Sequence, residues 1–236
     1  MKKAREFVAA LAAAATVGAA QAAVVSGTDD LLFVTGSGSN QASLVIDFND
    51  GLSSESFAWG YRWDGVASGA GMLLAVAAAD PNLSITSFGT ADSGFFLTQI
   101  SYFDGVESHS ASGGTFATFP DDYVGWGYYL AGGTAGDDTF GPGGIPTAIP
   151  GDGSSLPGVW TTSPSGASLD SFGETGRILA DGAWDAWSFG PYDESFSHQA
   201  SPGPEAPRAA SVPDQGSTLL LGLLSFALLI LRPRSE

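Results

Sequence analysis

Cysteine is absent from the 236 residues of this chain, so disulfide bonds and thiolate metal sites are excluded. Histidine occurs twice, as His109 in a Ser/Gly-rich stretch and His198 in a Pro-rich one, and we expect both rings to be exposed. The His-x-x-x-His spacing of metal sites and the Gly-x-Ser-x-Gly motif of many serine hydrolases are both missing. We therefore expect neither an enzyme nor a bound cofactor or metal, and a secreted hydrolase is a remote alternative.

Basic residues are scarce and gather at the two ends of the chain. Eight Lys and Arg stand against 25 Asp and Glu, a net charge of −17. Between residues 23 and 211 only three Arg remain against 22 acidic residues, which leaves a net charge of −19. Such a surface repels nucleic acid and anionic lipid, and it favours cations.

Two acidic pairs, Asp121-Asp122 and Asp137-Asp138, could form a calcium site or the carboxylate pair of a glycosidase. No calcium-loop motif accompanies either pair. We therefore interpret both as solvated loop residues.

The first 22 residues have the three parts of a secretory signal peptide. Lys2, Lys3 and Arg5 form a positive start, and an Ala-rich apolar stretch follows over 7–20. Ala20 and Ala22 flank Gln21 in a small-x-small cleavage site. We expect the secretion translocon and signal peptidase to act here, so that the mature chain starts near Ala23.

The last 25 residues, 212–236, have the pattern of a membrane-sorting tail. A polar motif leads into an uncharged run over 217–231, and Arg232 and Arg234 follow as a basic stop. As a helix of about 1.5 Å per residue, the run would cover roughly 22 Å, less than the roughly 30 Å hydrocarbon core. Local thinning or snorkelling of the two Arg would absorb the difference. The basic flank places this end in the cytoplasm and the body outside. A plain anchor that is never cleaved is the alternative to a processed signal.

This tail resembles the PEP-CTERM class of bacterial sorting signals in its Val-Pro-Asp-x-Gly-Ser-Thr variant. The matching residues are Val212, Pro213, Asp214, Gly216, Ser217 and Thr218. The common Pro-Glu-Pro is replaced by Pro213-Asp214-Gln215, and the tail says nothing about the body. The resemblance implies processing by an exosortase, a membrane-embedded protease. That enzyme would pass the body from the inner membrane to the cell surface or the exopolysaccharide matrix of a Gram-negative bacterium.

Between these two signals, apolar segments bounded by turn residues predict β-strands. The expected strands lie at 44–48, 57–63, 84–88, 95–102, 123–130, 160–163, 177–179 and 184–189. One helix is expected over 68–80, with Ser68 as its cap and with Met72, Leu73, Val76 and Ala79 on one apolar stripe. We expect little structure over 23–42, a mobile Gly/Pro-rich insertion over 131–158 and a Pro-rich stalk over 197–211.

One expected strand alternates completely between large and small residues. Phe57, Trp59, Tyr61 and Trp63 share one face, whereas Ala58, Gly60 and Arg62 share the other. We expect the helix to pack on the small-residue face. The aromatic face would then be covered by the insertion, a second chain or a ligand. Core packing is the simpler interpretation of these aromatic residues, and stacking on a flat ligand or a sugar is the alternative.

The body resembles the β-grasp-type module that forms the C-terminal domain of transcobalamin and occurs in bacterial surface proteins. Trp126, Tyr128, Gly132 and Gly133 match part of its aromatic strand, and Asp181-Gly182 matches the turn before its closing strand. The resemblance implies an α+β domain over 43–196, a small and mostly antiparallel sheet with one packed helix. The helical barrel that completes the corrin site of transcobalamin is missing, so corrin binding is not carried over.

These features predict an exported surface or matrix protein with a structural or interaction role and no nucleic-acid partner. Exosortase is its expected processing partner, and exopolysaccharide is a candidate partner of the finished protein. A surface module that binds a corrinoid or a glycan is the alternative.

Overall fold

The computed structural model describes residues 23–49, 55–114, 123–136, 146–151, 153–162, 166–171, 174–195, 197–199 and 204–212. The expected signal peptide, the tail beyond Val212 and both acidic pairs lie outside these residues. Within the described ranges, none of the helices has the length and apolar character needed to cross a membrane.

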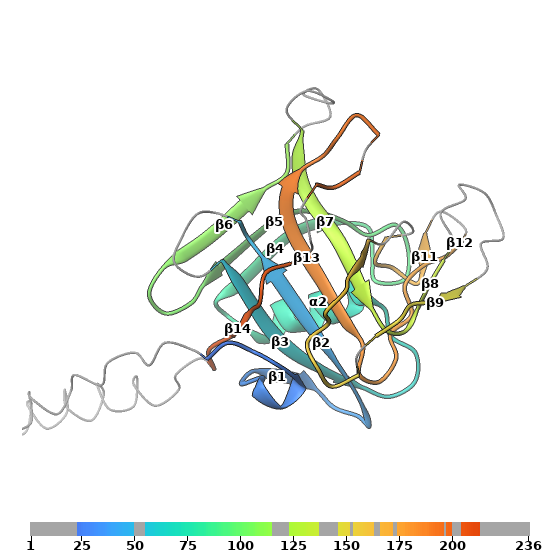
Figure 1. Ribbon diagram of the computed structural model, residues 1–236, viewed down its shortest axis with the longest axis horizontal. Helices are drawn as coiled ribbons and strands as arrows, with labels where there is room; N and C mark the ends of the chain where they lie inside the picture. Colours follow the sequence, from blue (N-terminus) through green and yellow to red (C-terminus); the bar gives the residue numbers. More distant parts are fainter. Residues whose placement is uncertain are drawn as a thin grey trace, which may run out of the picture.

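A seven-stranded sheet forms the centre of the fold (Figure 1). Its strand order is β1-β3-β2-β13-β7-β10, and β14 also pairs with β3. β13 runs parallel to β2 and antiparallel to β7, and β2 and β3 are antiparallel. The strands are β1 (Val34–Gly36), β2 (Asn40–Asp47), β3 (Ser56–Trp63), β7 (Val124–Ala131), β10 (Thr161–Thr162), β13 (Trp184–Pro191) and β14 (Arg208–Ala209).

A second sheet of three antiparallel strands consists of β4 (Leu83–Phe88), β5 (Phe96–Phe103) and β6 (Ser108–Ser112). Two short hairpin-like pairs complete the strands, β8 (Thr134–Ala135) with β9 (Thr147–Ala148), and β11 (Asp170–Ser171) with β12 (Glu174–Thr175). Helical turns are limited, in the described ranges, to η1 (Thr28–Asp30) and the α-helix α2 (Gly69–Ala79).

The expectation of an α+β, β-grasp-like domain is therefore wrong. The protein is mostly β and contains several sheets, with a single α-helix in the part that the structure describes. The second sheet explains much of the error, because β6 reads Ser108-His-Ser-Ala-Ser112. Its period-2 pattern is carried by small and polar residues, and so it lacks the apolar alternation that identifies a strand in sequence.

The helix begins and ends where its sequence signals place it. The Ser68 side chain accepts a hydrogen bond from the backbone N–H of Gly71 at 3.0 Å, as an N-cap does, and Asp80 follows the last helical residue. Met72, Leu73 and Val76 are buried, as the apolar stripe predicts, whereas Ala79, the fourth residue of that stripe, is exposed at the end of the helix.

The face against which the helix packs is the opposite of the one expected. The helix residues share one core with Phe57, Trp59 and Trp63, which are buried, and with the inner side of the second sheet. The indole N–H of Trp59 donates a hydrogen bond of 2.9 Å to Asp80 at the end of the helix. Large aromatic side chains offer more apolar area to a short Ala-rich helix than Ala58 and Gly60 do, and burial of that area decides the side.

The small-residue face of the sheet is covered by backbone segments. Ala58 belongs to a second core with Val25, Trp184 and Ala209. The side chain of Val34 lies directly over Gly60, where a Cβ would come within 2.9 Å of it. Small side chains on β3 therefore allow chain segments, and not a helix, to approach the sheet closely.

Regions expected to have no regular structure contribute to the fold. Part of the 131–158 range forms β8 and β9, and Ala135 is buried. Part of the expected stalk, 197–211, forms β14, and Ala209 and Ala210 are buried. Residues 23–42 supply β1 and the first residues of β2.

A substitution of Val76 tests the inverted packing. In the body, 23–212, Val76→Asp should cost several kcal/mol of unfolding free energy, because it buries an unpaired carboxylate against the aromatic face. Val66→Asp is the matched control, since Val66 is 70% exposed and should change stability by less than about 0.5 kcal/mol. Urea titrations of both variants measure the difference, and equal stabilities would show that Val76 does not face the core.

Candidate functional site

The two ends of the described chain lie side by side at the outer edge of β3. β14 pairs with β3 in parallel, with Ala209 opposite Ala58. Residues 23–25 then run antiparallel to β14. The N–H of Ala209 donates to the carbonyl of Ala23 at 3.2 Å, and the N–H of Val25 donates to the carbonyl of Pro207 at 2.8 Å. We call the region made of 23–25, β1, β14 and 210–212 the exit edge.

The last residues of the fold are held in place up to Ser211. The N–H of Ala210 donates to the carbonyl of Ala58, and the Tyr102 hydroxyl accepts a 3.2 Å hydrogen bond from the N–H of Ser211. Val212 is the first residue of the predicted sorting motif, and it is 58% exposed. The body therefore holds the chain up to the residue before the predicted motif, and the first motif residue is exposed.

A buried carboxylate, Asp47, holds the chain segment at Glu205 that leads into β14. Asp47, at the end of β2, accepts hydrogen bonds from the N–H of Glu205 at 3.1 Å and from the Ser188 hydroxyl at 3.2 Å. The Ser56 hydroxyl donates to the carbonyl of Glu205 at 3.2 Å, so both backbone groups of that residue are held. Burial raises the pKa of the Asp47 carboxyl to about 6, and the Glu205 carboxylate also raises it, although the hydrogen bonds from Glu205 and Ser188 act in the opposite direction.

His198 packs on the same sheet face as Asp47, over strand β7. Its ring covers Gly127, and its Nδ1 lies 2.7 Å from the Tyr129 hydroxyl. Burial lowers the pKa of His198 to about 4, so the ring is neutral at pH 7. The expectation of an exposed histidine in a stalk is wrong, because the segment folds back onto the sheet.

His109 is also buried and not in a loop. It lies in β6 with its ring 4.8 Å from that of Phe57 and 5.5 Å from that of Phe48. Both histidines therefore pack against aromatic rings inside the fold.

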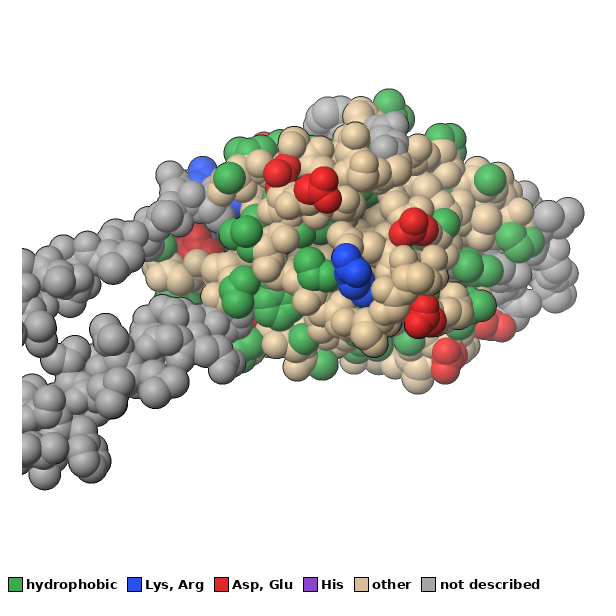
Figure 2. All heavy atoms as spheres, turned by 90° about the horizontal axis from the view of Figure 1, so that it is seen from below, with side chains coloured by type: hydrophobic (Ala, Val, Ile, Leu, Met, Phe, Trp, Pro, Cys, Tyr) green, Lys and Arg blue, Asp and Glu red, His purple; other side chains and the backbone are tan. Residues whose placement is uncertain are grey.

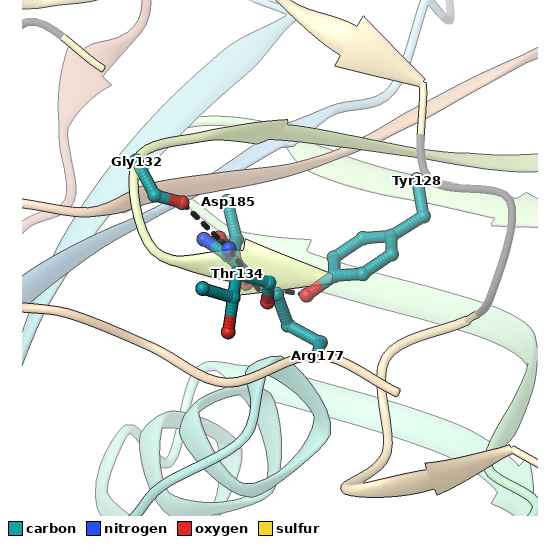
Figure 3. A network of polar contacts seen from close by, with 5 residues as sticks. All are labelled: Tyr128, Gly132, Thr134, Arg177 and Asp185. Atoms are coloured by element: carbon teal, nitrogen blue, oxygen red, sulfur yellow. Dashed lines mark hydrogen bonds and ion pairs between the residues drawn. The ribbon is translucent and has the colours of Figure 1, made fainter. Parts of the chain in front are cut away.

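A second polar network lies in the core beneath the start of α2 (Figure 3). The guanidinium of Arg177 pairs with the carboxylate of Asp185 on β13, and both side chains are fully buried. Nε of Arg177 donates to Asp185 at 3.0 Å, and NH1 donates to the carbonyl of Gly132 at 2.6 Å. The Tyr128 hydroxyl donates to the same carboxylate.

This network joins the sheet to the helix. A Cβ at Gly69, the first residue of α2, would overlap the Tyr128 hydroxyl, so only glycine allows the helix to start so close to the network. Burial raises the pKa of Tyr128, which remains a neutral donor, while the Asp185 carboxylate raises the pKa of Arg177 against the opposing effect of its burial. Two charges and their hydrogen bonds are satisfied by one another, which is the condition for burying them.

The structure describes only some of the site residues that the sequence predicts, and it places them differently from one another. Among the described sorting residues, Val212 is exposed at the end of the fold. The remaining motif residues, the basic stop and the cleavage-site alanines Ala20 and Ala22 lie outside the described ranges. The four candidate ligand-facing residues do not form an open face, because Phe57, Trp59 and Trp63 are buried and Tyr61 is half-buried and stacked on Trp63 at 5.7 Å.

Asp47 and the pair of Arg177 with Asp185 were missed by sequence reasoning. One signal was available: Asp47 and Asp185 lie within or at the end of strongly apolar strands, at positions where a charge needs a partner. Arg177 is the single basic residue between residues 63 and 207, and so it is the natural partner for a buried acid in that range.

Removing one partner of the buried pair should be costly. Arg177→Met leaves the Asp185 carboxylate buried without its counter-charge, and we expect a loss of about 3–5 kcal/mol in unfolding free energy. The double variant Arg177→Met/Asp185→Leu should lose less than the single one, because no charge is left buried. Arg62→Met, at an exposed position, is the control for loss of an Arg. An Arg177→Met variant as stable as this control would show that the ion pair does not contribute to the unfolding free energy.

The raised pKa of Asp47 predicts a pH dependence with a definite sign. Because the pKa of about 6 in the folded state exceeds the ordinary carboxyl value of 3.8, the folded state binds the proton more tightly. Stability contributed by the protonated form is then full below pH 4 and is lost as the pH rises through 6, by about 3 kcal/mol in total. Asp47→Asn removes this titration. Urea titrations between pH 4 and 7.5 should show the variant gaining on the wild type as the pH rises, and a pH-independent difference would contradict the assignment.

No family model matches the chain, and the searches of curated proteins and of solved structures also returned no match. Function is therefore inferred from the geometry of the exit edge and from the sequence signals next to it.

Proposed function

We propose that the protein is exported, is sorted by its C-terminal exosortase-type signal, and serves at the cell surface or in the extracellular matrix in a structural or interaction role without enzymatic activity. The observation that carries the proposal is that the body uses the chain right up to both predicted signals. Ala23, the residue after the predicted signal-peptide cleavage site, and Ser211, the residue before the predicted sorting motif, are both hydrogen-bonded to the body.

This coincidence supports two processing steps that spare the body. Cleavage before Ala23 would remove none of the described contacts, and a cut within the motif would leave β14 and its partners in place. A protease takes its substrate as an extended, accessible strand. Val212 is exposed, and the proline after it disfavours a helical conformation at this residue.

The position of the two ends also suits a precursor with two membrane segments. A domain of about 190 residues is about 40 Å across by the usual scaling of size with length. Ends on opposite sides could not both reach one membrane without long linkers. Here Ala23 and Ala209 are hydrogen-bonded to each other, so a signal peptide and a sorting helix would leave from the same edge.

The proposed role of the tail is tested in the native host. A form without residues 212–217, or the wild-type chain in a strain without exosortase, should remain in the inner membrane with its apolar run uncut. Val159→Ala, at a residue that is 80% exposed in the body, is the control and should reach the surface normally. Cell fractionation with mass analysis of both ends measures the outcome, including the expected start near Ala23. Delivery of the 212–217 deletion to the matrix at the wild-type level would refute sorting by this signal.

A further inference from the structure

Exposed apolar side chains gather along the exit edge. Val24 beside β14 and Leu32 before β1 are each 59% exposed, and Val34 in β1 is 41% exposed. Val212, where the chain leaves the fold, is exposed to a similar degree. Single exposed apolar residues are ordinary, but four at the place where the chain enters and leaves the fold need an explanation.

Two of the three basic side chains of residues 23–211 lie at or beside this edge. Residues 23–211 contain Arg62, Arg177 and Arg208, and Arg177 is buried against Asp185. Arg62 is exposed at the end of β3, and Arg208 is half-buried in β14. Neither forms an ion pair with a described residue. Figure 2 shows basic side chains on this side of the molecule beside hydrophobic ones. In a body with a net charge of −19, the placement of both remaining cations at one edge favours a partner with anionic groups.

Acidic residues at this edge limit how strong the attraction can be. Asp30 accepts hydrogen bonds from the backbone and side chain of Ser26 at 2.8 and 2.6 Å, and Asp64 accepts two from Ser39 at 3.0 Å. Asp29 is exposed in η1. The hydrogen bonds from Ser26 and Ser39 lower the pKa of Asp30 and of Asp64 and so favour their charged forms. A partner would therefore have to bind by apolar contact and two Arg–phosphate contacts together, and not by net charge.

The length of chain beyond Val212 identifies the partner. Six residues, 213–218, separate Val212 from Leu219 and the apolar run. Fully extended, they span about 20 Å at about 3.5 Å per residue. The headgroup layer on each side of a bilayer is about 5–7 Å thick. An uncut tail would therefore hold the exit edge within about 20 Å of the hydrocarbon core, at a high effective concentration of phospholipid.

We infer that the exit edge lies against the phospholipid surface of the inner membrane while the tail is uncut. Val24, Leu32 and Val34 enter the headgroup region, and Arg62 and Arg208 bind lipid phosphates. This inference rests on the proposed function, because the tail supplies the tether. The contact is weak without the tether, so cutting the tail also releases the body from the surface.

Fluorescence quenching tests this inference on the chain with its tail intact, reconstituted into vesicles of phosphatidylethanolamine and phosphatidylglycerol. The absence of cysteine allows a single fluorophore to be placed through Val34→Cys. Thr161→Cys is the matched control, because Thr161 is exposed in β10 at the opposite edge of the same sheet, about 24 Å away at about 4.8 Å per strand. With spin-labelled headgroups in the vesicles, we expect the Val34 probe to be quenched at least threefold more than the Thr161 probe. Arg62→Gln/Arg208→Gln should reduce the Val34 quenching by half or more.

Equal quenching at Val34 and Thr161 would overturn the inference, as would Val34 quenching that the double Arg variant leaves unchanged. Co-flotation of the chain with the vesicles is measured in the same samples and reports the anchor alone. Flotation without selective quenching is consistent with the proposed function but refutes the contact between the exit edge and the membrane. A chain that fails to float overturns the membrane anchor in the proposed function, and the inference falls with it.

Discussion

The outer edge of β3 is the constraint around which the fold is organised. β3 is buried on both faces, and a strand in that position exposes a row of unpaired backbone groups if its edge is left open. Two short strands close it, β14 along its first half and β1 along its second. One comes from each end of the described chain. The sheet therefore has no finished edge until both termini have folded against it, and both ends are brought to one place as a consequence.

This arrangement also explains why the small residues of β3 matter as much as its aromatic ones. Trp59 and its neighbours fill the core beneath α2, and Ala58 and Gly60 let Val25, Val34 and Ala209 come close on the other side. A larger side chain at position 60 would displace Val34, and with it the β1 half of the edge. Alternation between large and small side chains thus assigns one face of the strand to side-chain packing and the other to the chain ends.

Sequence reasoning located the central strands and the helix because their signals are local. The apolar run in β2, the alternation in β3, the aromatic segment after the Asp181-Gly182 turn and the Ser68 cap need no knowledge of the rest of the chain. The strands that were missed depend on tertiary partners. β14 and β1 are two and three residues long and exist because β3 needs an edge, and β6 is a Ser-rich strand that β5 recruits. The side of the sheet that the helix covers was also not a local property, since it followed from the apolar area available on each face.

In the candidate site, too, sequence reasoning found what local signals determine and missed what depends on tertiary partners. The sequence placed the start of the sorting motif at Val212, which is exposed, and Ser211 before it is held by the Tyr102 hydroxyl. It could not place Asp47, His198 or Arg177, because the role of each depends on what the fold brings against it. Perturbed pKa values often mark catalytic groups. Here they occur on Asp47, which holds the backbone of Glu205, and on Tyr128, which bonds the core ion pair beneath α2. Polar chemistry in this body is used to fix chain segments in position, and the segment fixed by Asp47 is the one that carries the chain to its exit. The buried charges at both places therefore have a structural role, because each holds together segments that are far apart in the sequence.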